Sequence, residues 1–253
     1  MLLSGPLFVF GCITMLYALA VLARGVRGRR RAKRVESVPV SRLASVTTPA
    51  AIAVRGRASS FNEPLTAPLT GRPALYYRVM ASEWVSSGKS GHYREALSEA
   101  RGESLLLDDG SGARALLLLA DANVVAKEKT GLCERKAGIF TTTLDETGAA
   151  YLEARGLTVT LPNGKQRSYR LSEAIVAPGD EVYACGRALP PDGPERLVVL
   201  RPGEGSAEEL IVSNLPGAEL ALTLGETFRG ARVILVFGAV LAAGAWLARE
   251  FGY

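Results

Sequence analysis

The first 23 residues carry no charged side chain, and this feature limits what the start of the chain can become more than any other. An α-helix rises about 1.5 Å per residue, so residues 1–23 would reach across the roughly 30 Å hydrocarbon core of a bilayer. A second uncharged run, residues 233–248, predicts another transmembrane helix over residues 231–249, with Arg232 and Arg249 snorkelling at its edges. A buried core helix is the alternative for this second run, which is apolar around its whole circumference.

A basic cluster follows the first run at once and opens a predicted juxtamembrane linker over residues 24–49. A secretory signal peptide carries its positive residues before the apolar run, so this order favours an uncleaved anchor. Because Lys and Arg stay on the cytoplasmic side, the cluster predicts a cytoplasmic central domain with both termini outside. The same side chains are predicted to contact an anionic membrane surface. They are Arg24, Arg27, Arg29, Arg30, Arg31, Lys33 and Arg34.

The positive charge of the chain is local. The cluster holds seven of the 30 Lys and Arg side chains, which leaves 23 bases against 25 acids elsewhere. A nearly neutral remainder does not indicate a general nucleic-acid-binding surface. We therefore expect the lipid bilayer and a membrane-bound or membrane-proximal protein, and not a nucleic acid, as partners.

Turn signals divide residues 50–225 into short apolar stretches, with motifs such as "LTGRP", "DDGSG", "LPNGK" and "APGDE" between them. Short strands at this spacing predict a mainly β domain, an antiparallel sandwich or a barrel-like module. The clearest hairpin runs from Glu103 to Leu119 around "DDGSG". One short helix is predicted in "TTTLDETGAAYLEARGL", beginning at a Thr cap and ending at Gly156.

Two adjacent tyrosines, Tyr76 and Tyr77, stand in a predicted strand, where neighbouring side chains face opposite sides of the sheet. One tyrosine is expected in the core and the other on the surface or against a second sheet. With Arg78 and Trp84 they form a candidate partner patch, because Tyr, Trp and Arg dominate binding hot spots.

No catalytic, cofactor or metal site is predicted. His92 is the only histidine, and it stands in a polar stretch read as a loop. Cys185 is expected to be packed in a strand, whereas Cys133 is the better candidate for a reactive thiol because Lys129, Arg135 and Lys136 could lower its pKa. Phosphate-binding loops, nucleophile elbows and dinucleotide fingerprints do not occur in the sequence.

Four stretches between the predicted spans, taken in order, resemble the GIDE domain of a protein family. They are "APLTGRPALYYRVMASEW" from Ala67, "SLLLDDGSGARALLLLADANV" from Ser104, "YLEARGL" from Tyr151 and "SEAIVAPGDEVYACGRA" from Ser172. The resemblance covers roughly residues 50 to 215. The family comprises membrane-anchored E3 ubiquitin ligases of mitochondria and chloroplasts and their bacterial relatives, and it implies a domain held beside a membrane by a helix on each side.

The resemblance does not extend to the RING domain that gives those ligases their activity. A RING holds two zinc ions, each by four Cys or His ligands, and three cysteines and one histidine cannot supply them. We therefore expect a membrane-tethered adaptor that recruits a partner, in a bacterial inner membrane. Two alternatives stay open: ligase-type activity together with a ubiquitin-like conjugation component, and an OB-like barrel that binds oligosaccharide or nucleic acid.

Overall fold

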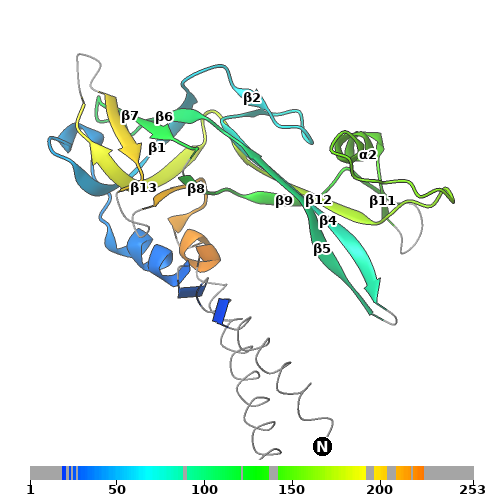
Figure 1. Cartoon of the computed structure of the whole chain (residues 1–253). Helices are drawn as coiled ribbons and strands as arrows, with labels where there is room; N and C mark the ends of the chain where they lie inside the picture. The colour runs from blue at the N-terminus through cyan, green and yellow to red at the C-terminus, as the bar shows by residue number, and fades with distance from the viewer. Residues whose placement is uncertain are drawn as a thin grey trace, which may run out of the picture. The chain divides into compact units, whose positions relative to one another are not determined.

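A computed structural model describes residues 19–20, 23, 25–26, 28–87, 90–120, 122–136, 142–191, 197–203, 209–217 and 219–224 (Figure 1). The chain divides into two compact units, Met1–Pro39 with Pro216–Tyr253, and Val40–Leu215. In the first unit, residues 28–37 and 219–224 are helical. Among the described residues, no helix has both the length and the apolar character needed to cross a bilayer. The predicted span 231–249, and span 1–23 except for residues 19, 20 and 23, lie outside the described residues.

The second unit is mainly β, which confirms the β-rich part of the predicted fold class but not its two flanking transmembrane helices. Its helical segments are the 3-10 helix η1 (Leu43–Ser45) and the α-helix α2 (Glu146–Glu153). Its strands are β1 (Ala50–Ser60), β2 (Leu65–Thr66), β3 (Pro73–Ala74), β4 (Tyr76–Ser87), β5 (Ser90–Arg101), β6 (Ser104–Asp108), β7 (Arg114–Leu118), β8 (Ala122–Val125), β9 (Glu128–Leu132), β10 (Glu134–Lys136), β11 (Thr142–Leu144), β12 (Tyr169–Val176), β13 (Glu181–Leu189), β14 (Leu197–Arg201) and β15 (Leu210–Ser213).

Five of these strands close into a barrel. The pairs are β1–β6, β6–β7, β7–β14, β14–β13 and β13–β1. Numbered along the chain, the barrel strands have the ring order 1-2-3-5-4, which is the order of an OB-type Greek-key barrel. Strands β15 and β8 extend the sheet from the edge of β13. Of the two predicted alternatives, sandwich and barrel, the barrel is therefore the one found.

Two pairings in this sheet, β7–β14 and β8–β15, are parallel, so the prediction of an antiparallel module is wrong at these places. Parallel neighbours need a long crossover between them. Between β7 and β14 the chain passes through β8 to β13. The spacing of turn signals reveals only strands that follow one another, so it could not indicate these distant pairs.

The barrel core is made by alternation along each strand. Leu105 and Leu107 of β6 are fully buried with Ala115 and Leu117 of β7, while Leu106 between them faces outward and is half-buried. Successive side chains of a strand point to opposite faces, so every second residue enters the barrel. The hairpin predicted from Glu103 to Leu119 is confirmed as β6–β7.

A second sheet, in the order β5-β4-β12-β9, lies on two insertions into the barrel. Strands β4 and β5 stand between the first and second barrel strands, and β9 and β12 between the third and fourth. Figure 1 shows β4, β5 and β12 side by side, and pairing of β12 with β4 joins the two insertions. Helix α2 packs on this sheet through Tyr151 and Leu152, which share a second core with Tyr77, Val79 and Leu171.

Helix α2 begins at a different cap from the predicted threonine. The Asp145 side chain accepts a hydrogen bond from the backbone N–H of Gly148 at 2.8 Å. The threonine Thr142 belongs instead to β11, which pairs with β10. The predicted end is close to correct, because the helix ends at Glu153 and Gly156 follows with φ +76°, a left-handed conformation that glycine adopts readily.

Candidate functional site

The structure separates the four residues of the predicted partner patch, Tyr76, Tyr77, Arg78 and Trp84, although all lie on β4. Tyr76 is half-buried against the barrel core, and Tyr77 is 5% exposed in the second core. Burial is the main cause that raises the pKa of both phenols above the ordinary value. The surface alternative for the second tyrosine is therefore wrong, because β4 runs between two cores and gives one tyrosine to each.

Trp84 is the member of the predicted patch that stays exposed, at 44%. Its ring meets Tyr93 of β5 edge to face, with centroids 5.0 Å apart. The guanidinium of Arg170 on β12 lies 4.3 Å from the centroid of the Tyr93 ring. We call Trp84, Tyr93 and Arg170 the aromatic patch. Arg78 faces the same side of β4 but stands six residues away, about 20 Å along the strand, so it is not part of the patch.

Part of the Trp84 ring packs across the β4–β5 hairpin onto Gly91. A Cβ atom on Gly91 would collide with the indole ring, so the ring lies directly over the backbone of β5. The remaining surface of Trp84, with Tyr93 and Arg170, is open to a partner. Sequence analysis missed Tyr93 and Arg170. The stretch "EWVSSGKSGHY" carries a signal for Tyr93, since "SSGKSG" is a turn motif in the sequence and the strands on its two sides pair Trp84 with Tyr93.

A polar cluster fixes helix α2 to strand β5. The Glu99 carboxylate accepts hydrogen bonds from Arg155 Nε at 2.5 Å and from the Tyr151 hydroxyl at 3.0 Å. The Arg155 guanidinium also stacks 3.6 Å from the centroid of the Tyr151 ring. The hydrogen bond from Arg155 is the main cause that lowers the pKa of Glu99, and burial raises the pKa of Tyr151 well above its usual range. The cluster holds a helix in place and contains no open nucleophile or metal ligand set.

The lowered pKa of Glu99 makes a stability prediction. A carboxyl whose pKa is depressed by folding stabilises the folded chain above its unfolded pKa, near 4.5, and this contribution is lost as pH falls through the folded value. We expect the free energy of unfolding to fall more steeply below about pH 4.5 in the natural chain than in Glu99→Gln. Urea unfolding measured from pH 7 to pH 3 checks this, and parallel pH profiles of the two proteins would contradict it.

The predicted membrane-contact cluster lies partly outside the described residues, which do not include Arg24 and Arg27. The other five, Arg29, Arg30, Arg31, Lys33 and Arg34, lie on the helical segment 28–37. The predicted linker therefore contains a helix. At the neighbouring Gly28, an added Cβ would collide with the carbonyl oxygen of Leu224, so the two helical segments of the first unit approach closely there.

The candidate thiol Cys133 lies in an acidic environment. Burial, followed by the nearby carboxylates of Asp145 and Glu173, raises the pKa of Cys133 to about 11. The interpretation that neighbouring bases lower it is therefore wrong, and Cys133 is a protonated thiol at neutral pH. Cys185 is fully buried on β13, as predicted, and His92 is exposed on strand β5 and not in a loop. Among the described residues, no group of His, Cys, Asp and Glu side chains could hold a metal ion.

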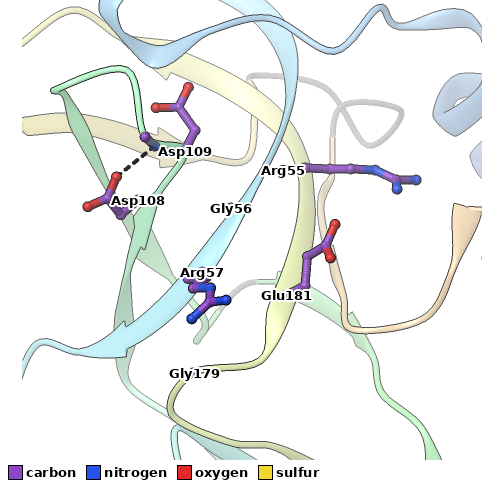
Figure 2. A pocket seen from close by; sticks show the side chains of 8 residues that line it. Arg55, Gly56, Arg57, Asp108, Asp109, Gly179 and Glu181 are labelled. Carbon is purple, nitrogen blue, oxygen red and sulfur yellow. Dashed lines mark hydrogen bonds between the residues drawn. The ribbon is translucent and has the colours of Figure 1, made fainter.

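A pocket of about 560 Å³ opens at one end of the barrel (Figure 2). Strand β1, the β6–β7 turn and the β12–β13 turn line it. Its charged side chains stand on these three segments, and Figure 2 shows Arg57 between Asp108 on one side and Glu181 on the other. The residues that line it are Arg55, Gly56, Arg57, Asp108, Asp109, Gly110, Gly179 and Glu181.

The outward face of the barrel at β6, β7 and β14 is apolar in its middle. Leu106, Leu116 and Val199 stand in register across the three strands, and Leu118 beside them is 40% exposed. In OB-type barrels, the second and third strands form the face that binds oligonucleotides and oligosaccharides. Here that face carries leucines and not the aromatic rings on which bases stack. Its chemistry suits a protein surface better than a nucleic acid.

Comparison with protein-family models, with curated proteins and with solved structures finds no match to this chain. Function must therefore be inferred from the residues and their arrangement.

Proposed function

We propose that the chain is a membrane-tethered binding module of the GIDE type, an adaptor that recruits a protein partner at the cytoplasmic face of a bacterial inner membrane. The aromatic patch is the observation that carries the proposal. Trp, Tyr and Arg are the residue types that contribute most energy at protein interfaces. Trp84 and Tyr93 are both exposed while most other large apolar side chains of the described second unit are buried or half-buried.

The tether supports recruitment by raising local concentration. A domain held to a membrane at both ends meets membrane-bound partners at an effective concentration set by its tethers, so a modest interface suffices. The basic cluster adds electrostatic attraction to an anionic leaflet. For this role the aromatic patch has to bind a partner and does not have to catalyse a reaction.

The two alternatives differ in the partner. Ligase-type activity would require a ubiquitin-like conjugation component as partner, because the chain has too few Cys and His residues to build a RING. Binding of oligonucleotides or oligosaccharides is favoured by the OB-type strand order, but the leucines on the β6–β7 face argue for a protein. The adaptor accounts best for both the apolar barrel face and the aromatic patch.

Site-specific crosslinking in native membranes tests the proposal. A photoreactive residue at position 170 reports on the aromatic patch, and one at position 94 reports on the opposite face of the same sheet, where Arg94 pairs with Glu83 at 3.3 Å. We expect one membrane-resident protein to crosslink at position 170 and not at position 94. Adding Trp84→Ala should weaken capture by about thirtyfold, the usual loss at an interface hot spot.

Each outcome of the crosslinking experiment is informative. A ubiquitin-like or E2-like protein captured at position 170 would favour the ligase-type alternative over the simple adaptor. Equal capture at both positions, or capture that Trp84→Ala leaves unchanged, would refute the aromatic patch as the partner site. Circular dichroism of the Trp84→Ala chain shows whether the hairpin has kept its structure.

A further inference from the structure

The pocket at the barrel end is hollow because glycines line it. A Cβ atom on Gly56 would collide with the carbonyl oxygen of Asp108, so β1 and the β6–β7 turn meet there backbone to backbone. Gly110 and Gly179 have φ angles of +74° and +88°, and a Cβ on either would meet no atom within 4 Å. The two turns therefore open into the hollow without side chains that fill it. Its volume, about 560 Å³, is in the range of small-ligand sites.

The pocket holds charges of both signs that form no ion pair with each other among the described residues. Arg57 stands opposite Glu181 on β13 and opposite Asp108 on β6, positions whose Cβ atoms lie about 5 Å apart in a sheet. Within the part of the chain that the structure describes, neither the Arg57 guanidinium nor the Glu181 carboxylate has a hydrogen bond or ion pair. A cation and an anion thus face one hollow, and each is exposed without a partner among the described residues.

The other charged side chains complete this arrangement. Arg55 lies two residues before Arg57, on the same face of β1, with its guanidinium 5.7 Å from the centroid of the Tyr183 ring. Asp109 is turned away to accept hydrogen bonds from the backbone N–H of Leu43 at 2.7 Å and from the Ser111 hydroxyl. The Asp108 carboxylate accepts a hydrogen bond from the Gly110 backbone N–H at 2.8 Å. The Arg57 guanidinium and the Glu181 carboxylate therefore remain as the pair of opposite charges for a ligand.

We propose that this pocket binds a small zwitterion that carries an oxyanion and a primary ammonium a few bonds apart, as phosphoethanolamine does. The oxyanion pairs with Arg57, since guanidinium groups bind phosphate and carboxylate through paired N–H donors. The ammonium donates to Glu181. A free anion would leave Glu181 without a partner and a free amine would leave Arg57 without one, so a ligand with both charges satisfies both groups.

Calorimetric titration of the full chain, purified in an uncharged sugar detergent, tests the site with O-phosphoethanolamine as probe. We expect saturable binding at least about tenfold tighter than that of inorganic phosphate or ethanolamine. Phosphocholine, which has the same charges but no N–H donors, should bind more weakly. Arg57→Gln and Glu181→Gln should each weaken binding about tenfold, since each loses a charge-assisted contact.

Two further variants separate the pocket from general charge effects. Gly179→Asn keeps every charge and tolerates a positive φ, but places a side chain in the hollow, so it should weaken binding. Arg114→Gln changes an arginine that pairs in register with Asp108 but does not line the pocket, and it should leave binding unchanged. Absence of saturable binding, or binding that Arg57→Gln and Glu181→Gln both leave intact, would overturn the proposal.

A second set of titrations distinguishes a lipid headgroup from a free zwitterion as the ligand. Short-chain phosphatidylethanolamine is titrated beside short-chain phosphatidylcholine. Tighter binding of the former than of O-phosphoethanolamine assigns the pocket to a lipid headgroup, whereas binding of the soluble probe alone assigns it to a free zwitterion. The proposal does not depend on the aromatic patch, because Trp84→Ala alters no residue of the pocket and should leave titration unchanged.

Discussion

Replacing Leu117 with alanine is expected to lower the free energy of unfolding by about 3 kcal/mol, the middle of the range for a buried leucine. Leu117 is fully buried in the barrel core between β6 and β14, opposite Leu105 and Leu200. Its truncation leaves a cavity in a ring of strands that cannot easily collapse, because each strand is held on both sides. Urea unfolding of the full chain, followed by far-UV circular dichroism, measures the change.

The neighbouring residue gives a matched control. Leu118 is the same side chain on the same strand, but it faces outward and is 40% exposed. Leu118→Ala is expected to lower the free energy of unfolding by less than about 1 kcal/mol, because the exposed leucine side chain buries little apolar surface that the substitution could remove. Similar losses for the two variants would mean that the strand alternation assigned to β7 is not the one present in solution.

Local features of this fold were predictable because they depend on residues that are close together in the sequence. The β6–β7 hairpin follows from two apolar arms around Asp108 to Gly112, where Gly110 and Gly112 supply positive φ angles. The opposite faces of Tyr76 and Tyr77 follow from the period of a strand. The helix at residues 146–153 was predicted from its apolar side chains and its terminal glycine. The predicted threonine cap was wrong because the preceding threonines pair in a strand.

Features that depend on distant pairings could not be read from the sequence. The strand order of the barrel depends on the parallel pair β7–β14, whose partners are separated by six other strands. The acidic surroundings of Cys133 depend on Glu173, 40 residues later. The pocket depends on three segments that meet only in the folded chain. In each case the sequence around each residue predicts only a strand or a turn. The chemical role arises when the fold brings the distant segments into contact.

Truncating Glu173 is the second change expected to have a large effect, with a loss of about 3 kcal/mol in the free energy of unfolding for Glu173→Ala. Glu173 is 1% exposed on β12. Its carboxylate accepts hydrogen bonds from the Leu69 backbone N–H at 2.9 Å and from the Thr70 hydroxyl at 2.6 Å. Without the carboxylate, a buried N–H and a hydroxyl lose their acceptor, and each unsatisfied donor costs about 1–3 kcal/mol.

Two further variants test whether the loss of stability comes from the hydrogen bonds of Glu173. Thr70→Val removes one donor and leaves the Leu69 contact, so it should cost about 1 kcal/mol. Glu128→Ala, an exposed glutamate on the adjacent strand β9, should be nearly neutral. If Glu173→Ala were as mild as Glu128→Ala, the carboxylate would not be the group that holds the turn.

The Glu173 contact also adds to the β4–β12 pairing that joins the two insertions of the second sheet. Thr70 and Glu173 are 103 residues apart, one in the first insertion of the barrel and the other in the second. The motif "LTGRP" is in sequence only a turn signal, and Gly71 with φ +66° confirms that use. Its threonine and the preceding amide have a further role, because they bind the buried carboxylate of β12 and so fix the turn that leads into β4. Since β4 carries Trp84, we expect Glu173→Ala to loosen the aromatic patch as well as to lower stability, which reduced crosslinking at position 170 would reveal.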